Sequence, residues 1–476
     1  MSASPRRWWA LAVLATAQFM VIMDTSIIGV ALPDMQRELG FSQSGLQWVF
    51  NAYVVALGGL LLLGGRLSDL FGARRVFTAG WLVLIGGSVV AAAATGAEAE
   101  IAGRAVQGVG SALIAPSALT LLMVLFSARP KELAKAMAFY GAAAPAGGTA
   151  GVFLGGVITE WLSWPWVFII YIPIGLLTLA MVPAVLPDVP GRRAGLDVLG
   201  ALAVTGGLGL AVYAIVQAPG RGWDSAATAL QLGGAVLLLA IFVGLQRVVR
   251  NPLMPLSVWR TPNLAGANVA MMLLGAAWIP MWYFLNLYLQ QVLGYGAFPS
   301  GAALVPMTAL MMVLMVGVTG RLIARFGTKP LIVAGLAVLA AGLAVLSAID
   351  AGGSFAADVL PGSLISAVGM SLVFIPATMA AIGGAAPEQG GLASGIVNTT
   401  YQVGSAIGLA VMTAIATSQG ADRLGDLPGL TDGFQAAFIG AAAVALAGAG
   451  LALATLRTPT MRGGAEEQVK EEKIQV

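Results

Sequence analysis

Fourteen long apolar runs, separated by short polar connections, constrain this chain more than any other feature of its sequence. Most have about 20 residues, the length that a helix needs to cross the roughly 30 Å hydrocarbon core of a bilayer. Only 9% of the residues are charged, whereas soluble domains have about 25%. The sequence therefore predicts an all-α integral membrane protein with fourteen transmembrane helices. The expected spans are 8–31, 45–65, 76–95, 101–125, 135–158, 165–186, 197–218, 227–248, 264–291, 300–323, 329–349, 357–381, 391–418 and 433–456.

A short charged segment between two apolar runs occurs twice. The residues of the first copy recur 255 positions later: Gly65, Arg66, Leu67, Phe71, Gly72 and Arg74 match Gly320, Arg321, Leu322, Phe326, Gly327 and Lys329. An internal repeat in a membrane chain predicts two bundles that rock against each other. Because the copies are eight helices apart, we expect six-helix bundles at 1–190 and 256–456, with an inserted helix pair at 191–255. The remaining segment, 457–476, is expected to be a disordered cytoplasmic tail.

The basic residues predict the orientation of the chain. If the first residues are cytoplasmic and the helices alternate, almost all of the 24 Lys and Arg residues fall on the cytoplasmic side. Only Arg37, Arg221 and Arg423 fall outside, and Arg104 lies within a helix. This asymmetry predicts cytoplasmic N- and C-termini in a cytoplasmic (inner) membrane. It also accounts for the net charge of +3 without a nucleic-acid partner.

Several functions are excluded by what the chain lacks. It contains neither Cys nor His, which excludes a thiolate metal site, a Cys nucleophile and an imidazole proton relay. It has no Gly-x-x-x-x-Gly-Lys-Ser/Thr loop that would hold ATP phosphates. We expect no metal, no cofactor and no enzymatic activity, since a membrane-embedded enzyme needs a polar catalytic cluster at depth. We also expect a monomer.

Two charged side chains fall within apolar runs. Asp24 lies about 24 Å along the first helix at a rise of 1.5 Å per residue, and Arg104 lies about one turn into the fourth span. A charge at membrane depth costs about 3 kcal/mol or more and indicates function, and opposite charges at equal depth are expected to pair. We interpret Asp24 and Arg104 as a proton-coupling pair. The alternatives are an Asp24 at the wet interface and an Arg104 that snorkels to water.

The fifth span carries a stripe of glycines at four-residue spacing, Gly147, Gly151 and Gly155, with Gly156 beside it and Pro145 upstream. Glycine stripes let neighbouring helices approach closely. This pattern predicts a pivot, with simple helix packing as the alternative.

A substrate pocket is expected around the ninth span. Trp278, Trp282 and Asn286 share one helix face because they are four residues apart, which predicts a broad apolar platform with one polar group. Aromatic belts at membrane interfaces are the alternative for such residues. The full set of expected pocket residues is Gln107, Trp278, Trp282, Tyr283, Asn286, Asn398, Tyr401 and Gln402.

The segment from Gly65 to Val76 resembles the loop between the second and third helices of major facilitator superfamily transporters. The resemblance rests on Gly65, Asp69, Gly72, Arg74 and Arg75 in register. The positive end of the helix that begins near Gly390 would attract the Asp69 carboxylate, so we expect this segment to lock the outward-open state. The alternative is a solvated salt bridge worth about 0–1 kcal/mol.

Further segments resemble the drug:proton antiporters with fourteen spans. Met23–Pro33 is similar to their first-helix signature, with Gly29 where Asn is usual, and the run from Arg104 to Gly110 resembles their fourth-helix motif, whose Arg is linked to proton transfer. The chain departs from the family at Val152, where Pro is usual, and at Tyr401, where Arg is usual.

The resemblance implies a bacterial exporter of lipophilic drugs or antibiotic-like natural products that works by proton antiport. A proton-coupled importer or a metabolite exporter on the same fold remains open, and a membrane-embedded enzyme is a remote alternative. We expect no Asp or Glu within the spans of the second bundle. The substrate is therefore expected to be a small lipophilic molecule, neutral to monocationic, because a dication would lack counter-charges in a low-dielectric cavity.

Overall fold

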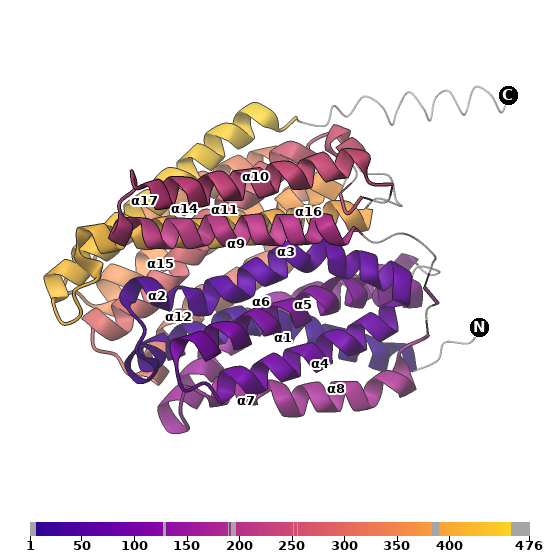
Figure 1. The fold of residues 1–476 in the computed structure, drawn as a ribbon, viewed down its shortest axis with the longest axis horizontal. Helices are drawn as coiled ribbons and strands as arrows, with labels where there is room; N and C mark the ends of the chain where they lie inside the picture. Colours follow the sequence, from indigo (N-terminus) through magenta and orange to yellow (C-terminus); the bar gives the residue numbers. More distant parts are fainter. Residues whose placement is uncertain are drawn as a thin grey trace.

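The computed structural model describes residues 6–126, 130–188, 190–191, 197–250, 252–254, 256–382 and 390–457. Across these ranges the chain forms helices and no strands (Figure 1). Fourteen helical segments are long and apolar enough to cross a membrane. The predicted all-α membrane fold is therefore confirmed.

The N-terminal half contains six of these spans. Its elements are α1 (Arg6–Leu39), α2 (Gln43–Leu46), α3 (Trp48–Phe71), α4 (Ala73–Ala92), α5 (Ala97–Phe126), α6 (Pro130–Trp161), α7 (Trp166–Ile169) and α8 (Tyr171–Val185). The expected start of the fourth span at residue 101 is wrong, because α5 begins four residues earlier. Glu98 and Glu100 lie in its first turn, where the positive end of the helix favours carboxylates. Arg104 is consequently about two turns into the helix rather than one.

The C-terminal half is built in the same way. Its elements are α11 (Leu264–Leu287), η2 (Tyr288–Val292), α12 (Ala297–Val313), η3 (Leu314–Val318), α13 (Thr319–Phe326), α14 (Thr328–Leu346), η4 (Phe355–Val359), α15 (Leu360–Ile382), α16 (Gly390–Ala416), η6 (Thr417–Ala421) and α17 (Leu427–Thr455). Two acidic residues belong to helical segments here. Asp358 accepts a hydrogen bond from the Ser354 amide at the start of η4, and Asp432 is exposed near the start of α17. The expectation that this half has no acid within its spans is therefore wrong for Asp358 and Asp432, both of which lie within about one turn or two of a helix end.

An inserted helix pair lies between the halves in the sequence. It consists of α9 (Val198–Arg221) and α10 (Ala226–Val248), and the short helix η1 (Leu256–Arg260) leads on to α11. Figure 1 shows α9 beside α3, and α9 also packs against α16. Helix α9 therefore covers the seam between α3 of one half and α16 of the other, and α10 packs on α9.

The base of the inserted pair is fixed by buried polar contacts. One carboxylate oxygen of Asp197 accepts a hydrogen bond from the Gly200 amide at 2.7 Å and caps α9. Its other oxygen accepts one from the Gln246 side chain at 2.7 Å. Gln246 in turn accepts a hydrogen bond from the Met254 amide at 2.9 Å. These bonds tie both helices to the connection that follows them. Of the expected tail, all residues after Arg457 lie outside the described residues.

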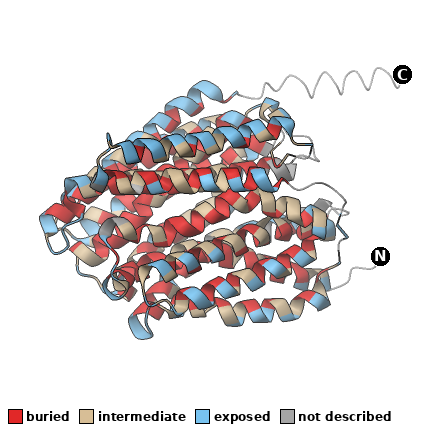
Figure 2. Cartoon of the chain, viewed as in Figure 1, coloured by how far each residue is buried: buried red, intermediate tan, exposed pale blue. Residues whose placement is uncertain are grey.

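Buried side chains fill the contacts between helices, whereas the outer surfaces of the bundle carry exposed apolar residues such as Leu230 and Leu237 (Figure 2). Some helices touch backbone to backbone. A Cβ atom added to Gly64 would lie 2.0 Å from the Ala112 carbonyl oxygen, and one added to Gly404 would lie 1.9 Å from that of Met272. Such small-residue contacts are typical of helices that pack within a membrane.

The two halves are hydrogen-bonded to each other at one end of the bundle. We call the end at which α1 begins and α17 ends the terminal end, and the opposite one the far end. Near the far end, Gln291 donates a hydrogen bond to the Gln36 side chain at 3.0 Å, and Gln290 donates one to the Val30 carbonyl at 3.0 Å. Gln36 and Gln291 are 255 residues apart, so they occupy equivalent positions of the internal repeat. The repeat-related helices α1 and α11 therefore meet through a glutamine at the equivalent position of each helix.

Candidate functional site

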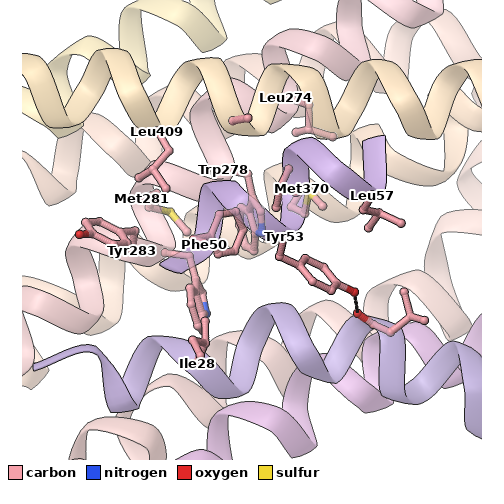
Figure 3. Packing of buried hydrophobic residues seen from close by; sticks show 14 of the residues in the cluster. Ile28, Phe50, Tyr53, Leu57, Leu274, Trp278, Met281, Tyr283, Met370 and Leu409 are labelled. Carbon is pink, nitrogen blue, oxygen red and sulfur yellow. Dashed lines mark hydrogen bonds between the residues drawn. The ribbon is translucent and has the colours of Figure 1, made fainter. Parts of the chain in front are cut away.

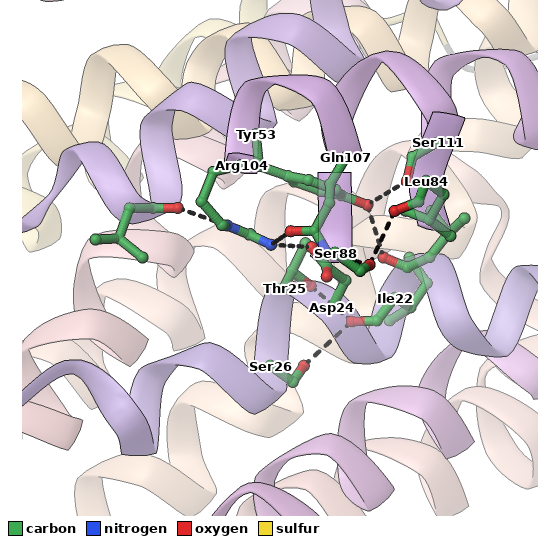
Figure 4. A network of polar contacts seen from close by, with 12 residues as sticks. Ile22, Asp24, Thr25, Ser26, Tyr53, Leu84, Ser88, Arg104, Gln107 and Ser111 are labelled. Atoms are coloured by element: carbon green, nitrogen blue, oxygen red, sulfur yellow. Dashed lines mark hydrogen bonds and ion pairs between the residues drawn. The ribbon is translucent and has the colours of Figure 1, made fainter. Parts of the chain in front are cut away.

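The polar centre of the N-terminal half is an ion pair between α1 and α5 (Figure 4). Arg104 Nη1 lies 2.6 Å from Asp24 Oδ2. The exposed fraction of these side chains is 0% for Arg104 and 1% for Asp24. The structure thus brings together the two charges that the sequence singled out, and neither is at a wet interface.

Further hydrogen bonds hold the Arg104 guanidinium in place. Its Nε donates to the Val49 carbonyl of α3 at 2.8 Å, and its Nη1 donates to Gln107 at 2.7 Å. Gln107 donates to the Ser88 hydroxyl of α4 at 2.8 Å. The structure places Gln107, expected in the pocket, in this network. The guanidinium of α5 is therefore bonded to α1 and α3 and linked through Gln107 to α4.

Aromatic rings enclose the ion pair. The Arg104 Cζ atom lies 4.6 Å from the centre of the Tyr53 ring and 5.8 Å from that of Phe168. The Tyr53 hydroxyl donates to the Val21 carbonyl of α1 at 3.1 Å and is hydrogen-bonded to the Ser111 hydroxyl of α5 at 2.9 Å. Tyr171 of α8 is fully buried, and its hydroxyl has no hydrogen-bond partner among the described residues. Because these rings exclude water, a change of charge at Asp24 acts strongly on its neighbours.

Glu100 is a site residue that the sequence analysis missed. Its side chain is fully buried on α5, one turn before Arg104. The fourth span is expected to begin at residue 101, so Glu100 falls in the polar connection before it. The signal that would have found it is its four-residue spacing from Arg104, which puts both side chains on one helix face.

The glycine stripe of α6 faces α1. Cβ atoms added to Gly147, Gly151 and Gly155 would lie 2.4, 2.9 and 2.7 Å from backbone carbonyl oxygens of α1. One added to Gly156 would lie 2.9 Å from the Ala297 carbonyl oxygen at the start of α12. The stripe therefore joins α6 to the helix that carries Asp24 and, through Gly156, to the C-terminal half. The pivot role stays a prediction, and the side chain of Pro145 lies outside what the structure describes.

Aromatic residues of α11 lie where the halves meet. Figure 3 shows Trp278 near Phe50 and Tyr53 of α3. Trp278 and Trp282 are each only 6% exposed. The tip of the Trp282 ring lies 2.3 Å from the position that a Cβ atom of Gly29 would take. Gly29 is thus the place on α1 where the Trp282 ring fits.

The remaining expected pocket residues are spread over α11 and α16. Asn286 donates to the Trp282 carbonyl at 2.8 Å, and Tyr283 packs edge-on against its neighbour in α11. On α16, the Tyr401 ring lies 5.6 Å from that of Phe374, and Gln402 packs beside Gly58 of α3. Asn398 lies half-buried on the same helix.

A separate apolar cavity, wide open on one side, lies between the halves, between α6 and α12. Its volume is about 440 Å³. The residues that line it are Ala146, Thr149, Ala150, Phe153, Val305 and Met312. None of these belongs to the expected pocket. The sequence could not reveal the cavity, because its two walls come from helices that meet only when the halves dock.

The predicted locking segment lies at the terminal end. Gly72 ends α3 with a φ of 89°, and its repeat equivalent Gly327 ends α13 with a φ of 79°. Both need the left-handed region that glycine tolerates.

The other residues of the locking segment make few contacts. Asp69 is exposed and makes no ion pair or hydrogen bond to a described residue. Gly65 lies beside Pro116, Arg74 accepts a hydrogen bond from Thr78 through its carbonyl, and Arg75 is exposed. The lock stays a prediction.

Two repeat-related helical halves, the first of which encloses a buried ion pair, define this protein as a membrane transporter rather than an enzyme. The chain belongs to the Major Facilitator Superfamily, whose profile matches residues 14–409 and 316–475. It is 38% identical to a cephamycin export protein of Amycolatopsis lactamdurans, over 92% of this chain and 90% of that protein. It is 36% identical to a puromycin resistance protein of Streptomyces alboniger, over 89% and 84% of the two chains. The suspected family is therefore confirmed.

Solved structures share the fold. A peptide transporter in complex with sulfate superposes with a TM-score of 0.69 at 16% identity and covers 94% of both chains. A nucleoside transporter superposes with a TM-score of 0.66 at 14% identity, over 94% of this chain and 99% of that one. At these identities the likeness concerns the fold alone.

Proposed function

We propose that this protein exports small lipophilic, antibiotic-like compounds in exchange for protons. The observation that carries the proposal is the ion pair between Asp24 and Arg104, which is buried between α1 and α5. A charged pair at membrane depth is costly and marks a functional site in transporters. The relatives named for cephamycin export, puromycin resistance and tetracenomycin C export support the direction of transport and the substrate class.

In this proposal Asp24 binds the proton that drives the cycle. Protonation removes the negative charge that holds Arg104, and a buried guanidinium without its partner is strongly unfavourable. The pair is therefore rearranged, and α1 moves with it. Since α1 packs on the α6 stripe and is hydrogen-bonded to α11, its movement reaches both halves. This is how proton binding would favour one access state over the other.

The lining of the interface supports an apolar substrate. The cavity between α6 and α12 has apolar walls apart from Thr149. The buried rings of Trp278 and Trp282 lie where the halves meet. Rings attract a cation by only about 0.5–2 kcal/mol, and the described acids of the C-terminal half lie near helix ends. We propose neutral, zwitterionic or monocationic substrates for this reason.

The distribution of basic residues supports a cytoplasmic membrane location with both termini in the cytoplasm. In that orientation the far end faces outward, and the contacts between the halves at the far end correspond to an inward-facing arrangement. The exposed Asp69 is consistent with this arrangement, since the proposed lock would form when the terminal end closes. A monomer is proposed as the working unit.

Everted membrane vesicles test the function. A pH gradient, acid inside, should drive uptake of puromycin or tetracenomycin C, and each compound should release protons from the vesicles. Asp24→Asn fills the same volume but cannot titrate, so gradient-driven uptake should fall at least about tenfold while substrate exchange without a gradient remains. Asp34→Asn, farther along α1, is the matched control and should behave like the wild type. Full gradient-driven uptake by Asp24→Asn would exclude Asp24 as the coupling residue, and uptake in the opposite direction only would indicate an importer.

A further inference from the structure

A second carboxylate lies beside the proton-coupling pair. Glu100 of α5 is 0% exposed, and neither of its carboxylate oxygens has a hydrogen-bond partner among the described residues. The nearby Glu98, in the same first turn, is exposed. The helix N-terminus attracts both residues, so this attraction does not explain why one of the two is buried.

The groups around Glu100 are few. Arg104 on its own helix and Asp24 on α1 are the charges that act on it. Tyr53 of α3 and Tyr171 of α8 are the further ionisable groups beside Asp24 and Arg104 among the described residues. The last turn of α4, residues 89–92, carries no ionisable side chain, and its Ala91 packs against Gly103 of α5.

Arg104 has a free donor as well. Its Nε and Nη1 are hydrogen-bonded, but Nη2 is buried and has no partner in the described part of the chain. Side chains four residues apart on a helix lie about 6 Å from each other at Cβ. A small rotation of the guanidinium can therefore bring this donor to the Glu100 carboxylate.

Charge balance limits what the cluster can hold. One guanidinium compensates one carboxylate, and a second ionised carboxylate buried without a donor is strongly unfavourable. The neutral state of the cluster thus contains one proton shared by two acids. In the arrangement observed here Arg104 is paired with Asp24, which leaves the proton to Glu100.

We propose that Glu100 is a second proton-binding residue, which exchanges its proton with Asp24 while Arg104 changes partner. The inference deepens the proposed proton coupling and rests on it. In the step, the Glu100 carboxyl loses its proton and becomes the partner of Arg104, and the Asp24 carboxylate, released by Arg104, gains a proton. The total charge is unchanged, so no charge is left uncompensated in the low-dielectric interior. Because Glu100 lies in the first turn of α5, at the far end, it is placed between that surface and Asp24.

Transport assays in proteoliposomes test this role. In Glu100→Gln, Arg104 has no second partner, so gradient-driven transport of puromycin should fall at least about tenfold. Exchange of puromycin without a gradient should persist and shows that the variant is folded. Glu98→Gln makes the same charge change in the same turn and should match the wild type, and Glu100→Asp should restore part of the driven transport with an altered pH profile. The proposal would be overturned if Glu100→Gln and Glu98→Gln showed equal gradient-driven transport with an unchanged pH profile.

Infrared spectroscopy gives a second test that does not depend on transport. The wild type and Glu98→Gln should show the carbonyl band of one buried protonated carboxyl group, which Glu100→Gln should lack. Asp24→Asn should lack it too, because Arg104 then pairs with Glu100 and ionises it. A missing band in the wild type, or a band that persists in Glu100→Gln, would contradict the assignment. Transport by the wild type that does not depend on the pH gradient would contradict the proposed function itself. If Asp24→Asn loses this dependence and Glu100→Gln keeps it, only the role proposed for Glu100 is wrong.

Discussion

Gly29 shows how one residue on α1 depends on a residue of the other half. The first-helix signature that the chain resembles has Asn where Gly29 stands. In the structure the Trp282 ring occupies the space that any side chain at this position would need. The indole of Trp282 from α11 therefore fills the space in which the Asn side chain would lie, and an aromatic contact replaces a polar one.

This contact predicts the effect of restoring the family residue. Gly29→Asn should destabilise the protein by about 1–3 kcal/mol, because overpacking forces the Trp282 ring and its neighbours to move. Thermal unfolding in detergent would measure the loss. Gly86→Ala is the control, since a Cβ atom there meets nothing within 4 Å. If the loss persists at full size when Trp282→Ala is added, the two residues are not coupled and the explanation is wrong.

The residues of the site differed in how far the sequence could reveal them. Asp24 and Arg104 were identified because charges inside apolar runs are costly, and the structure places them in contact. The sequence did not reveal Glu100 as a site residue, because hydropathy does not show where a helix begins when its first turn carries acidic residues. The network around Gln107 depends on α3 and α4 as well, and such contacts between distant segments leave no periodic pattern in a sequence.

At the level of helices, the glycine stripe of α6 gives a close contact that the sequence anticipated. Four-residue spacing puts the glycines on one face, and α1 is the helix that lies on that face. Two neighbouring glycines differ sharply in their surroundings. A Cβ atom at Gly147 would lie 2.4 Å from the Phe19 carbonyl oxygen, whereas one at Gly148 would have only the Ser26 hydroxyl, at 3.8 Å.

These neighbours make a matched pair of variants. Gly147→Ala should separate α6 from α1 and destabilise the protein by about 1–3 kcal/mol, with slower transport because α1 carries Asp24. Gly148→Ala should be tolerated and gains helix propensity. Melting temperatures and vesicle uptake of both variants would be compared with the wild type. Equal behaviour of the two would show that the stripe is not a close helix contact in the working transporter.

For the whole molecule, the repeat in the sequence predicted two halves, but not how they dock. The number of helices and the repeat follow from apolar length and residue spacing, which are local properties. The cavity between α6 and α12 and the closed far end depend on the relative placement of the halves. That placement changes during transport in proteins of this fold, so no fixed pattern in the sequence can encode a single arrangement.

The pairing of Gln36 with Gln291 places a contact between repeat-equivalent residues at the far end. If the halves rock about a common axis, equivalent positions of α1 and α11 must separate when the far end opens. A link between them would therefore hold the far end closed and stop the cycle. The chain contains no Cys, so Gln36→Cys and Gln291→Cys can be introduced together and joined by a short bifunctional thiol reagent without background.

The cross-linked double variant should lose transport by at least about tenfold, since its halves can no longer exchange access. Reductive cleavage of the link should restore transport, and each single Cys variant treated with the same reagent should keep its activity. Substrate binding from the terminal end should survive in the linked protein, because the contact lies away from the ion pair and the cavity. Undiminished transport by the linked protein would mean that the far end does not open by separation of α1 from α11, and the two-bundle rocking proposed for this chain would have to be abandoned.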